Sequence, residues 1–369
     1  MRVPFADLKA QYLTHKNEID SAIFNVIEDG SFIGGKYVDQ FEQEFGKAYG
    51  VKNVVSCANG TDSLYIIMKM LGIGPGDEVI TVSNSWISSS ETITQTGAKV
   101  RFVDIDPDYF TMDETSIASS ITKETKAILV VHLYGQMCNM NAIKEICDKH
   151  KLYLIEDCAQ SHFSSLGNTR AGLFGIAASF SFYPGKNLGA YGDAGCIISN
   201  DDDFALKCRK YSKHGALKKH FHEIEGINSR MDGIQASILL AKLPYILDWT
   251  SKRIQVAEWY NDYLGDIPQI IIPKKRENTL HSYHLYVIKA ENRTQLMSHL
   301  KALEIDTLIH YPTPLPFMEA YGYLKHQIKD FPNLATTRDH ILSLPIFPEM
   351  TQDMVKFVAD SIRAFYHAN

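Results

Sequence analysis

Apolar, strand-like runs alternate with amphipathic helical segments between about residues 54 and 199 of this chain. The runs cover residues 54–56, 78–82, 99–103, 127–131, 152–155, 178–182 and 196–199. Their nearly continuous hydrophobicity is typical of strands that are buried on both faces of a sheet. Between them, segments such as 61–72 and 141–150 carry apolar residues at helical spacing. This order predicts an α/β fold with a seven-stranded, mostly parallel sheet.

The flanking segments predict helices before the sheet and a second, smaller domain after it. Apolar residues at helical spacing over 19–27 and 38–48 are followed by Gly30 and Gly50, which favour helix ends. Beyond about Pro244 come a long helix, a strand-like run at 283–288, a helix at about 293–303 and a final helix from Thr351. We therefore expect a large domain over residues 1–245 and a smaller α+β domain over residues 246–369, since 369 residues can form two cores.

Composition and charge argue against several classes of function. Hydrophobic residues make up 45% of the chain and the net charge is −6, which argues against general affinity for nucleic acid or an anionic membrane. The N-terminus has no apolar signal core, and no apolar run reaches membrane-spanning length. Six cysteines are scattered without a Cys-x-x-Cys or zinc pattern. We expect a cytoplasmic protein with reduced thiols and with no metal, nucleic-acid partner or membrane attachment.

Lys186 is the first candidate catalytic residue. It lies in the segment 179–189, where an apolar run is broken by Pro184 and Gly185 and is followed by small residues. Most lysines are surface residues, but partial desolvation in such a loop would lower the pKa of the amine, as a Schiff-base lysine requires. Ser181 is close enough in sequence to offer its hydroxyl to a phosphate.

Asp157 and Gln160 come directly after the run 152–155. Ligands bind at the carboxyl ends of strands in open α/β sheets. A lysine at one strand end and a carboxylate at a neighbouring one are the minimal equipment of a pyridoxal phosphate enzyme, in which the lysine forms a Schiff base and the carboxylate keeps the pyridine nitrogen protonated. A cap or ion pair is the simpler explanation of Asp157 taken alone, and His162 is more simply a packed, hydrogen-bonded histidine.

Three further segments admit two interpretations each. Gly60 and Thr61 follow a predicted strand and open a helix, which suits either an anion site or a plain N-cap. Trp86, just past a strand end, could stack on a planar ring or pack in the core. Asn228 lies in a polar turn that by itself indicates only helix capping. The glycine-rich run 72–76 follows a helix and precedes a strand, the reverse of the dinucleotide-binding order, so a nucleotide-binding dehydrogenase is not indicated.

Taken together, these motifs resemble one family. The segments 59–64, 74–79, 132–135, 156–160, 181–189, 228–230 and 310–312 occur in this order in the pyridoxal-phosphate-dependent sugar aminotransferases of the DegT/DnrJ/EryC1/StrS group. The resemblance runs over essentially the whole chain. It implies the aspartate aminotransferase-like fold of the fold-type-I transferases and activity on nucleotide-linked keto sugars.

The resemblance also implies a role for each candidate residue. Lys186 would bind pyridoxal 5′-phosphate and later move protons between the substrate carbon and the cofactor, which passes through its pyridoxamine 5′-phosphate form. Asp157 would pair with the pyridine nitrogen and Gln160 with the ring hydroxyl. The phosphate would be bound by Gly60, Thr61 and Ser181, and the ring would stack on Trp86. Asn228 would contact the phosphate of the neighbouring subunit's cofactor. The sugar side of the pocket would be lined by Tyr183, His310 and Tyr311. The contact by Asn228 makes a homodimer with shared active sites part of the expectation.

The implied reaction moves an amino group from L-glutamate to a nucleotide-linked keto sugar. The loop 182–190 and the segment 307–312 resemble those of members that aminate C3 of dTDP-3-keto-6-deoxyhexoses, giving dTDP-3-amino-3,6-dideoxyhexose, with galacto ahead of gluco, for glycan, O-antigen or S-layer sugars. The alternative is amination at C4 of a dTDP-, UDP- or GDP-4-keto-6-deoxy sugar. A sugar dehydratase of the same fold is not indicated, because those relatives carry histidine at the position of Lys186. A more remote alternative is a non-catalytic, pyridoxal-phosphate-binding regulator, which would need no intact Lys186, Asp157 and Gln160.

Overall fold

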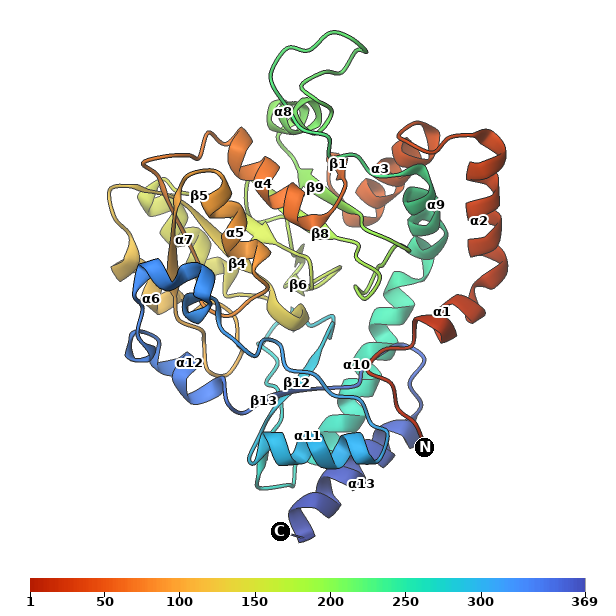
Figure 1. The fold of residues 1–369 in the computed structure, drawn as a ribbon, viewed down its shortest axis with the longest axis vertical. Coiled ribbons are helices and arrows are strands. Elements are labelled where there is room, and N and C mark those ends of the chain that lie inside the picture. The colour runs from red at the N-terminus through yellow and green to blue at the C-terminus, as the bar shows by residue number, and fades with distance from the viewer. Residues whose placement is uncertain (369) are drawn as a thin grey trace.

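A seven-stranded sheet forms the centre of the computed structural model, which describes residues 1–368 (Figure 1). The strands lie in the order β1-β9-β8-β5-β4-β2-β3. Among them only β9 runs antiparallel to its neighbours β1 and β8, so the predicted mostly parallel sheet is confirmed. The bounds are β1 Asn53–Cys57, β2 Glu78–Val82, β3 Lys99–Val103, β4 Thr125–Val131, β5 Tyr153–Asp157, β8 Ala177–Ser181 and β9 Gly195–Ser199.

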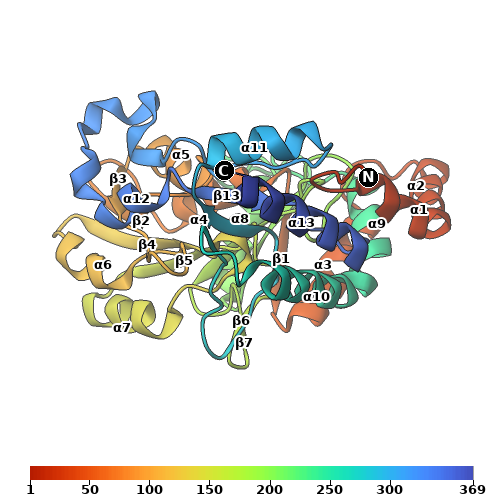
Figure 2. The same ribbon diagram turned by 90° about the horizontal axis from the view of Figure 1, so that it is seen from below.

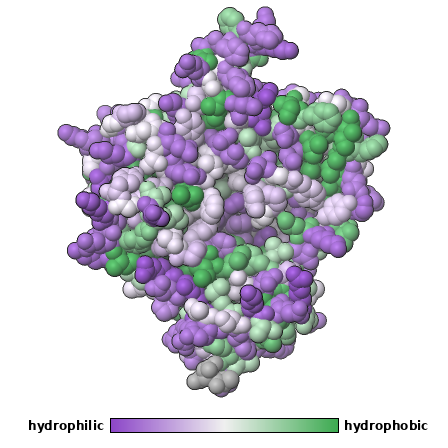
Figure 3. Space-filling model, in the orientation of Figure 1, coloured by the Kyte–Doolittle hydropathy of each residue, from purple (hydrophilic) through white to green (hydrophobic). Residues whose placement is uncertain are grey.

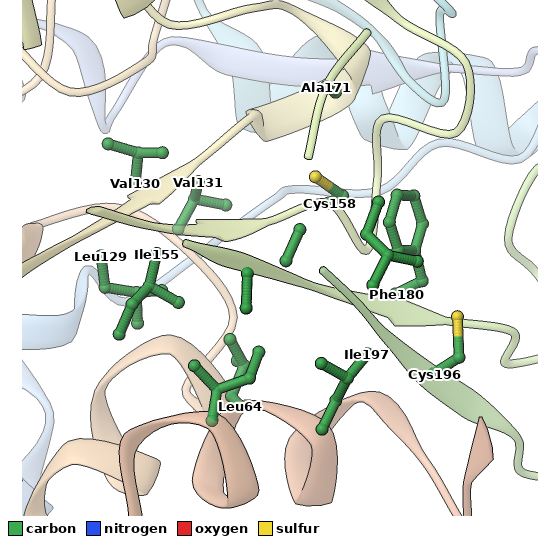
Figure 4. Close-up of a cluster of buried hydrophobic side chains, with 14 of the residues drawn as sticks. Leu64, Leu129, Val130, Val131, Ile155, Cys158, Ala171, Phe180, Cys196 and Ile197 are labelled. Atoms are coloured by element: carbon green, nitrogen blue, oxygen red, sulfur yellow. The ribbon is translucent and has the colours of Figure 1, made fainter. Parts of the chain in front are cut away.

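Helices cover both faces of this sheet. Alternate residues of a strand point to opposite faces, and in β8 the Ser179 hydroxyl contacts Ser63 of α4 whereas the Phe180 ring packs against Phe45 of α3. Helices α4 and α3 therefore lie on opposite faces. Figure 2 shows α6 and α7 on the other side of β2, β3 and β4 from α5, and Figure 4 shows Leu64 of α4 facing the apolar side chains of the strands. The bounds are α3 Lys36–Tyr49, α4 Gly60–Met70, α5 Ser88–Gln95, α6 Glu114–Ser120, α7 Met140–His150 and α8 Asp202–Ser212.

The predicted helices at the N-terminus are present, and both end where glycine was expected to end them. Gly30 and Gly50 adopt left-handed backbone conformations (φ 59° and 80°) after α2 and α3, a conformation that glycine adopts without a steric penalty. Helix α9 packs against both α2 and α3. The bounds are α1 Leu8–Thr14, α2 Lys16–Asp29, α9 Gly233–Lys242 and α10 Ile246–Leu264.

The C-terminal part of the chain builds a second, smaller core. Helices α10, α11 and α13 pack with the three-stranded antiparallel sheet β10-β12-β13. Segment 283–285, predicted to be part of a strand, lies before β12 because Leu285 N bonds instead to the Tyr134 carbonyl, at 3.2 Å. A further small sheet is formed by β11, β6 and β7. The bounds are β6 Ser165–Leu166, β7 Thr169–Arg170, β10 Ile270–Ile271, β11 Thr279–Leu280, β12 Tyr286–Ala290, β13 Ile341–Leu344, α11 Arg293–Ala302, α12 Pro332–Thr337 and α13 Gln352–Ala368.

The segment between α11 and β13 returns to the large sheet. Leu315, Tyr321, Phe331 and Leu334 are buried in the same apolar core as the seven strands, and the Asn333 N–H of α12 donates to Asp104 Oδ2, just after β3, at 2.7 Å. Residues 246–369 are thus not all gathered around the second core, and the division at residue 245 stays a prediction. Within residues 1–368, no helix combines the length and the apolar character needed to cross a bilayer.

Candidate active site

Lys186 and Asp157 lie at the carboxyl edge of the parallel strands. Asp157 is the last residue of β5 and is 5% exposed. Lys186 lies in the loop after β8, where its N–H donates to the Tyr183 carbonyl at 2.8 Å and closes a turn. Burial lowers the pKa of the Lys186 amine to about 8, and the negative charge of Asp157 acts in the opposite direction. The two predicted key residues therefore lie in one desolvated region and interact electrostatically.

The carboxylate of Asp157 is held by two donors. Ser89 Oγ donates to Oδ2 at 2.8 Å and the Ala159 N–H donates to Oδ1 at 3.1 Å. Burial raises the pKa of the Asp157 carboxyl above its ordinary value, while these two hydrogen bonds and the charge of Lys186 lower it. Asp157 is thus a buried acceptor with a fixed orientation, which is what a partner for a protonated ring nitrogen requires.

Gln160 is brought together with residues from the far end of the chain. Its Oε1 accepts from the Tyr134 N–H at 2.7 Å, and its Nε2 donates to Tyr311 Oη at 2.8 Å. The Trp86 ring lies 5.8 Å from the Tyr311 ring. Trp86 is 58% exposed, so the core-packing interpretation of Trp86 is wrong. The structure thus places Gln160, Trp86 and Tyr311 in one cluster.

His310 lies beside Tyr311 at the same edge. Its Nδ1 lies 2.8 Å from Ser343 Oγ. Burial lowers the pKa of His310 to about 4, and the positive charge of Lys186 acts in the same direction, so the imidazole is neutral near pH 7. Tyr183 is 59% exposed and accepts a backbone hydrogen bond from Lys186. His310 lies near enough to Lys186 for the two side chains to interact electrostatically.

The turn between β1 and α4 packs tightly against the end of β8. A Cβ on Gly60 would lie 2.8 Å from Ser181 Cβ, so only glycine fits there. Thr61 Oγ1 lies 2.7 Å from Ser88 Oγ, which brings in the start of α5. The predicted N-cap role falls to Asn59, whose side chain accepts from the Asp62 N–H at 2.7 Å. Backbone amides at this helix start, together with nearby hydroxyls, have the chemistry of a phosphate site.

Asn228 is exposed, and its Oδ1 accepts from Arg230 Nε at 2.9 Å. The next residue, Ser229, accepts from the Ala58 N–H at 3.1 Å. Segment 228–230 therefore lies beside the turn that opens α4, while the side chain of Asn228 itself contacts Arg230. The predicted role of Asn228 toward a neighbouring subunit stays a prediction.

A cavity of about 420 Å³ lies between the start of α3 and the loop that follows α8. This loop, residues 213–222, projects from the body of the protein (Figure 1). Its contribution to the cavity wall is rich in cations and histidines, namely Lys213, His214, Lys218, Lys219, His220 and His222, with Arg230 close by. The cavity wall does not include Lys186 or Asp157, so it is separate from the cluster at the carboxyl edge.

Several residues that support the site went unassigned from the sequence. Ser89 lies in a polar run after a predicted strand, a signal that could have marked it. Glu156, fully buried beside Asp157, accepts from the N–H groups of Gly172 (2.7 Å), Phe174 (2.8 Å) and Gly175 (2.8 Å). It thereby fixes the loop that leads into β8.

His132 also contacts Glu156 and completes its hydrogen bonds. Its Nε2 lies 3.0 Å from Glu156 Oε2, and its Nδ1 accepts from the Cys138 N–H at 3.2 Å. The proton therefore lies on Nε2 and is donated to Glu156. Cys158 completes a group of potential metal ligands, but the carboxylate and imidazole atoms are already engaged by protein partners.

His162 packs between Phe180 and Phe182, with ring centroids 5.4 and 5.6 Å away. Burial lowers its pKa to about 3, and the charge of Lys186 acts in the same direction. The packing is as predicted, but neither ring nitrogen of His162 has a well-formed hydrogen bond to a partner among the described residues.

Fold and site together define the class of protein as a fold-type-I transferase, with its lysine and aspartate at the carboxyl ends of adjacent parallel strands. The chain belongs to the DegT/DnrJ/EryC1/StrS aminotransferase family, whose model matches residues 14–363. This confirms the predicted family and fold class.

The relatives named below match over nearly their full lengths. A pleiotropic regulatory protein of Geobacillus stearothermophilus is 39% identical over 370 residues, which cover 99% of each chain. The dTDP-3-amino-3,6-dideoxy-alpha-D-galactopyranose transaminase of Aneurinibacillus thermoaerophilus is 39% identical over 98% of this chain and 99% of its own. Among solved structures, DesV of S. venezuelae in complex with a ketimine intermediate has a TM-score of 0.96 at 37% identity, covering 99% of this chain and 98% of that one.

Proposed function

We propose that this protein is a pyridoxal-phosphate-dependent aminotransferase that moves an amino group from L-glutamate to C3 of a dTDP-3-keto-6-deoxyhexose. The observation that carries the proposal is the electrostatic pairing of a half-buried amine, Lys186, with a buried carboxylate, Asp157, at the carboxyl edge of the sheet. The product would be dTDP-3-amino-3,6-dideoxyhexose, with galacto preferred over gluco, and the place of action the cytoplasm.

The residues present fit the cofactor. Gly60 lets the turn that opens α4 approach Ser181 closely, because a Cβ there would lie 2.8 Å from Ser181 Cβ, and with Thr61 and Ser181 it would hold the phosphate. Asp157 would face the ring nitrogen and Gln160 the ring hydroxyl, with Trp86 stacked on the ring. When bound, pyridoxal phosphate supplies an electron sink for the bond changes at the substrate nitrogen and carbon.

Lys186 is suited to accept and donate a proton at Nζ. With its pKa lowered to about 8 by burial, a useful share of the amine is uncharged near neutral pH, as proton transfer in both directions requires. His310 is neutral near pH 7 because burial lowers its pKa to about 4, so it adds no charge that would oppose protonation of Lys186. Tyr183 and Tyr311 would line the sugar side.

The loop 213–222 supports a diphosphate-linked substrate. Lys213, Lys218 and Lys219 place ammonium groups around the cavity described above, and Arg230 adds a guanidinium. Such groups bind the charged oxygens of phosphates. We propose that this loop and Asn228 serve the active site of the neighbouring subunit in a homodimer.

Exposed apolar side chains support the proposed homodimer. Phe24 and Ile27 on α2 are 58% and 52% exposed, and Phe32 and Ile33, which follow this helix, are 48% and 53% exposed. Figure 3 shows hydrophobic residues gathered on the surface in the region of α2. Large exposed apolar patches commonly mark protein interfaces.

Amination at C3 is supported by the relative from A. thermoaerophilus, named as a 3-amino-3,6-dideoxygalactose transaminase. The alternative is amination at C4 of a dTDP-, UDP- or GDP-linked 4-keto sugar. A second candidate, a regulator that binds the cofactor without turnover, is favoured by the name of the relative from G. stearothermophilus.

The test offers the cofactor-loaded protein and L-glutamate to matched dTDP-linked 3-keto and 4-keto 6-deoxyhexoses, with NMR identification of the products. We expect an amine at C3 and release of 2-oxoglutarate. Lys186→Ala, the control, should fold normally and give no product. Amination at C4 alone would contradict the proposed position. An absorbance spectrum that glutamate does not change would favour the regulator.

A further inference from the structure

The Asp157 carboxylate is the end of a short chain of buried hydroxyl groups. Ser89 Oγ lies 2.8 Å from Asp157 Oδ2, and Ser85 Oγ lies 2.9 Å from Ser89 Oγ. Ser89 is fully buried and Ser85 is 2% exposed. A hydroxyl carries one proton. Because Ser89 donates its proton to the carboxylate, Ser85 must donate to Ser89, so both hydroxyls point toward Asp157.

We propose that Ser89, supported by Ser85, is a positioning residue that holds the Asp157 carboxylate charged and oriented for the ring nitrogen of the cofactor. This inference rests on the proposed function, in which Asp157 has that role. Hydrogen bonds in series polarise one another, so Ser85 strengthens the donor that Ser89 presents. The other oxygen of Asp157 is fixed by the Ala159 N–H at 3.1 Å, which leaves the carboxylate little freedom to turn.

The Asp157 carboxylate interacts with several titratable groups, whereas its hydrogen bond from Ser89 comes from a neutral hydroxyl. The titratable groups that interact with this carboxylate are Lys186, Tyr311, Cys158 and His132. Burial raises the pKa of Asp157, and the hydrogen bonds from Ala159 and Ser89 lower it. Of the two hydrogen bonds, only the one from Ser89 comes from a side chain. Ser89→Ala therefore removes a stabilising donor without changing any charge.

The experiment measures binding of pyridoxamine 5′-phosphate to the cofactor-free protein by calorimetry between about pH 5.5 and 8.5. This probe needs no bond to Lys186. A hydrogen bond to a charged group typically contributes about one pKa unit or more, so Ser89→Ala should bind roughly tenfold more weakly near pH 7. Affinity should also fall away at a pH about one unit higher than in wild type, because the carboxyl becomes protonated more easily. Ser85→Ala should move both quantities in the same direction by less.

Two variants test whether the loss of affinity in Ser89→Ala comes from removal of the hydroxyl or from the change in side-chain size. Ser89→Thr restores the donor and should restore affinity and pH dependence. Ser90→Ala is the matched control, since this neighbouring buried serine bonds to the Ile87 carbonyl at 3.0 Å and to Tyr321 Oη at 2.7 Å and not to Asp157. Wild-type affinity and pH dependence in a folded Ser89→Ala protein would overturn the inference, as would equal losses in Ser89→Ala and Ser89→Thr.

The remaining outcomes also decide the question. If circular dichroism shows that Ser89→Ala does not fold, Ser85→Ala takes its place, and wild-type binding by that variant overturns the inference. If the wild-type protein itself does not bind the probe, the proposed function fails together with the inference. Binding by wild type with no effect of Ser89→Ala refutes the hydroxyl chain alone.

Discussion

Substitution of Glu156 tests whether the buried hydrogen bonds to its carboxylate stabilise the loop that leads into β8. Its two oxygens accept four hydrogen bonds: Oε1 from the N–H groups of Phe174 and Gly175, and Oε2 from the Gly172 N–H and from His132 Nε2. All four donors lie within 3.0 Å, and the side chain is fully buried. Glu156→Gln keeps the shape of the side chain and replaces one acceptor oxygen by an NH₂ donor.

Neither orientation of the new amide satisfies its neighbours. With NH₂ at the Oε2 position it faces the donors from Gly172 and His132, and with NH₂ at the Oε1 position it faces two backbone N–H groups. If His132 Nε2 became an acceptor, the imidazole proton would lie on Nδ1 instead. There it would face the Cys138 N–H, which now donates to Nδ1. Two buried donors are left unpaired, at about 2 kcal/mol each, so Glu156→Gln should lower the free energy of unfolding by about 4 kcal/mol.

The assay is equilibrium urea unfolding of the cofactor-free protein, followed by circular dichroism and by fluorescence. Omitting the cofactor removes the contribution of ligand binding to the measured stability. Asp148→Asn is the control, because Asp148 is 66% exposed and forms an ion pair with Lys144 on the surface of α7, so the stability of this variant should stay close to that of wild type. A loss below about 1 kcal/mol in Glu156→Gln, which is typical of an ordinary substitution, would refute the four-donor account.

The remaining predictions concern the site. The reaction of the cofactor-free protein with pyridoxal phosphate, followed by stopped-flow absorbance, should become faster as the pH rises through about 8. The reason is that only the uncharged Lys186 amine attacks the aldehyde. A midpoint of the pH–rate curve near 10.5, the ordinary pKa of a lysine, would contradict the lowering of this pKa by burial. Gly60→Ala should weaken cofactor binding roughly tenfold through overpacking, whereas Gly322→Ala, with nothing within 4 Å of the new Cβ, should bind as wild type does. Replacing Lys218 and Lys219 by alanine should raise KM for the nucleotide sugar roughly tenfold and leave the half-reaction with glutamate unchanged; an unchanged KM would exclude these lysines from the substrate site.

The sequence predicted the sheet and its helices well because those features depend on local patterns. The run 78–82 and the run 99–103 coincide with β2 and β3, and α4 and α7 begin and end within two residues of the predicted segments. Burial of a strand on both faces and of a helix on one face each leaves a periodic trace in the chain. The chemical candidates Lys186 and Asp157 could be found for a related reason, since ligands gather where parallel strands end.

Only the tertiary structure decided which polar groups meet. The hydrogen bond from Gln160 to Tyr311 joins residues 151 positions apart, and that from Ser89 to Asp157 joins residues 68 apart. It also decided that Trp86 is exposed and that the side chain of Asn228 bonds to Arg230. By itself, the sequence determined the fold class and the family, and it indicated Lys186 and Asp157 as the candidate amine and carboxylate. The contacts that orient them depend on strand order and on helix packing, which result from many weak interactions across the whole core and leave no local pattern in the chain.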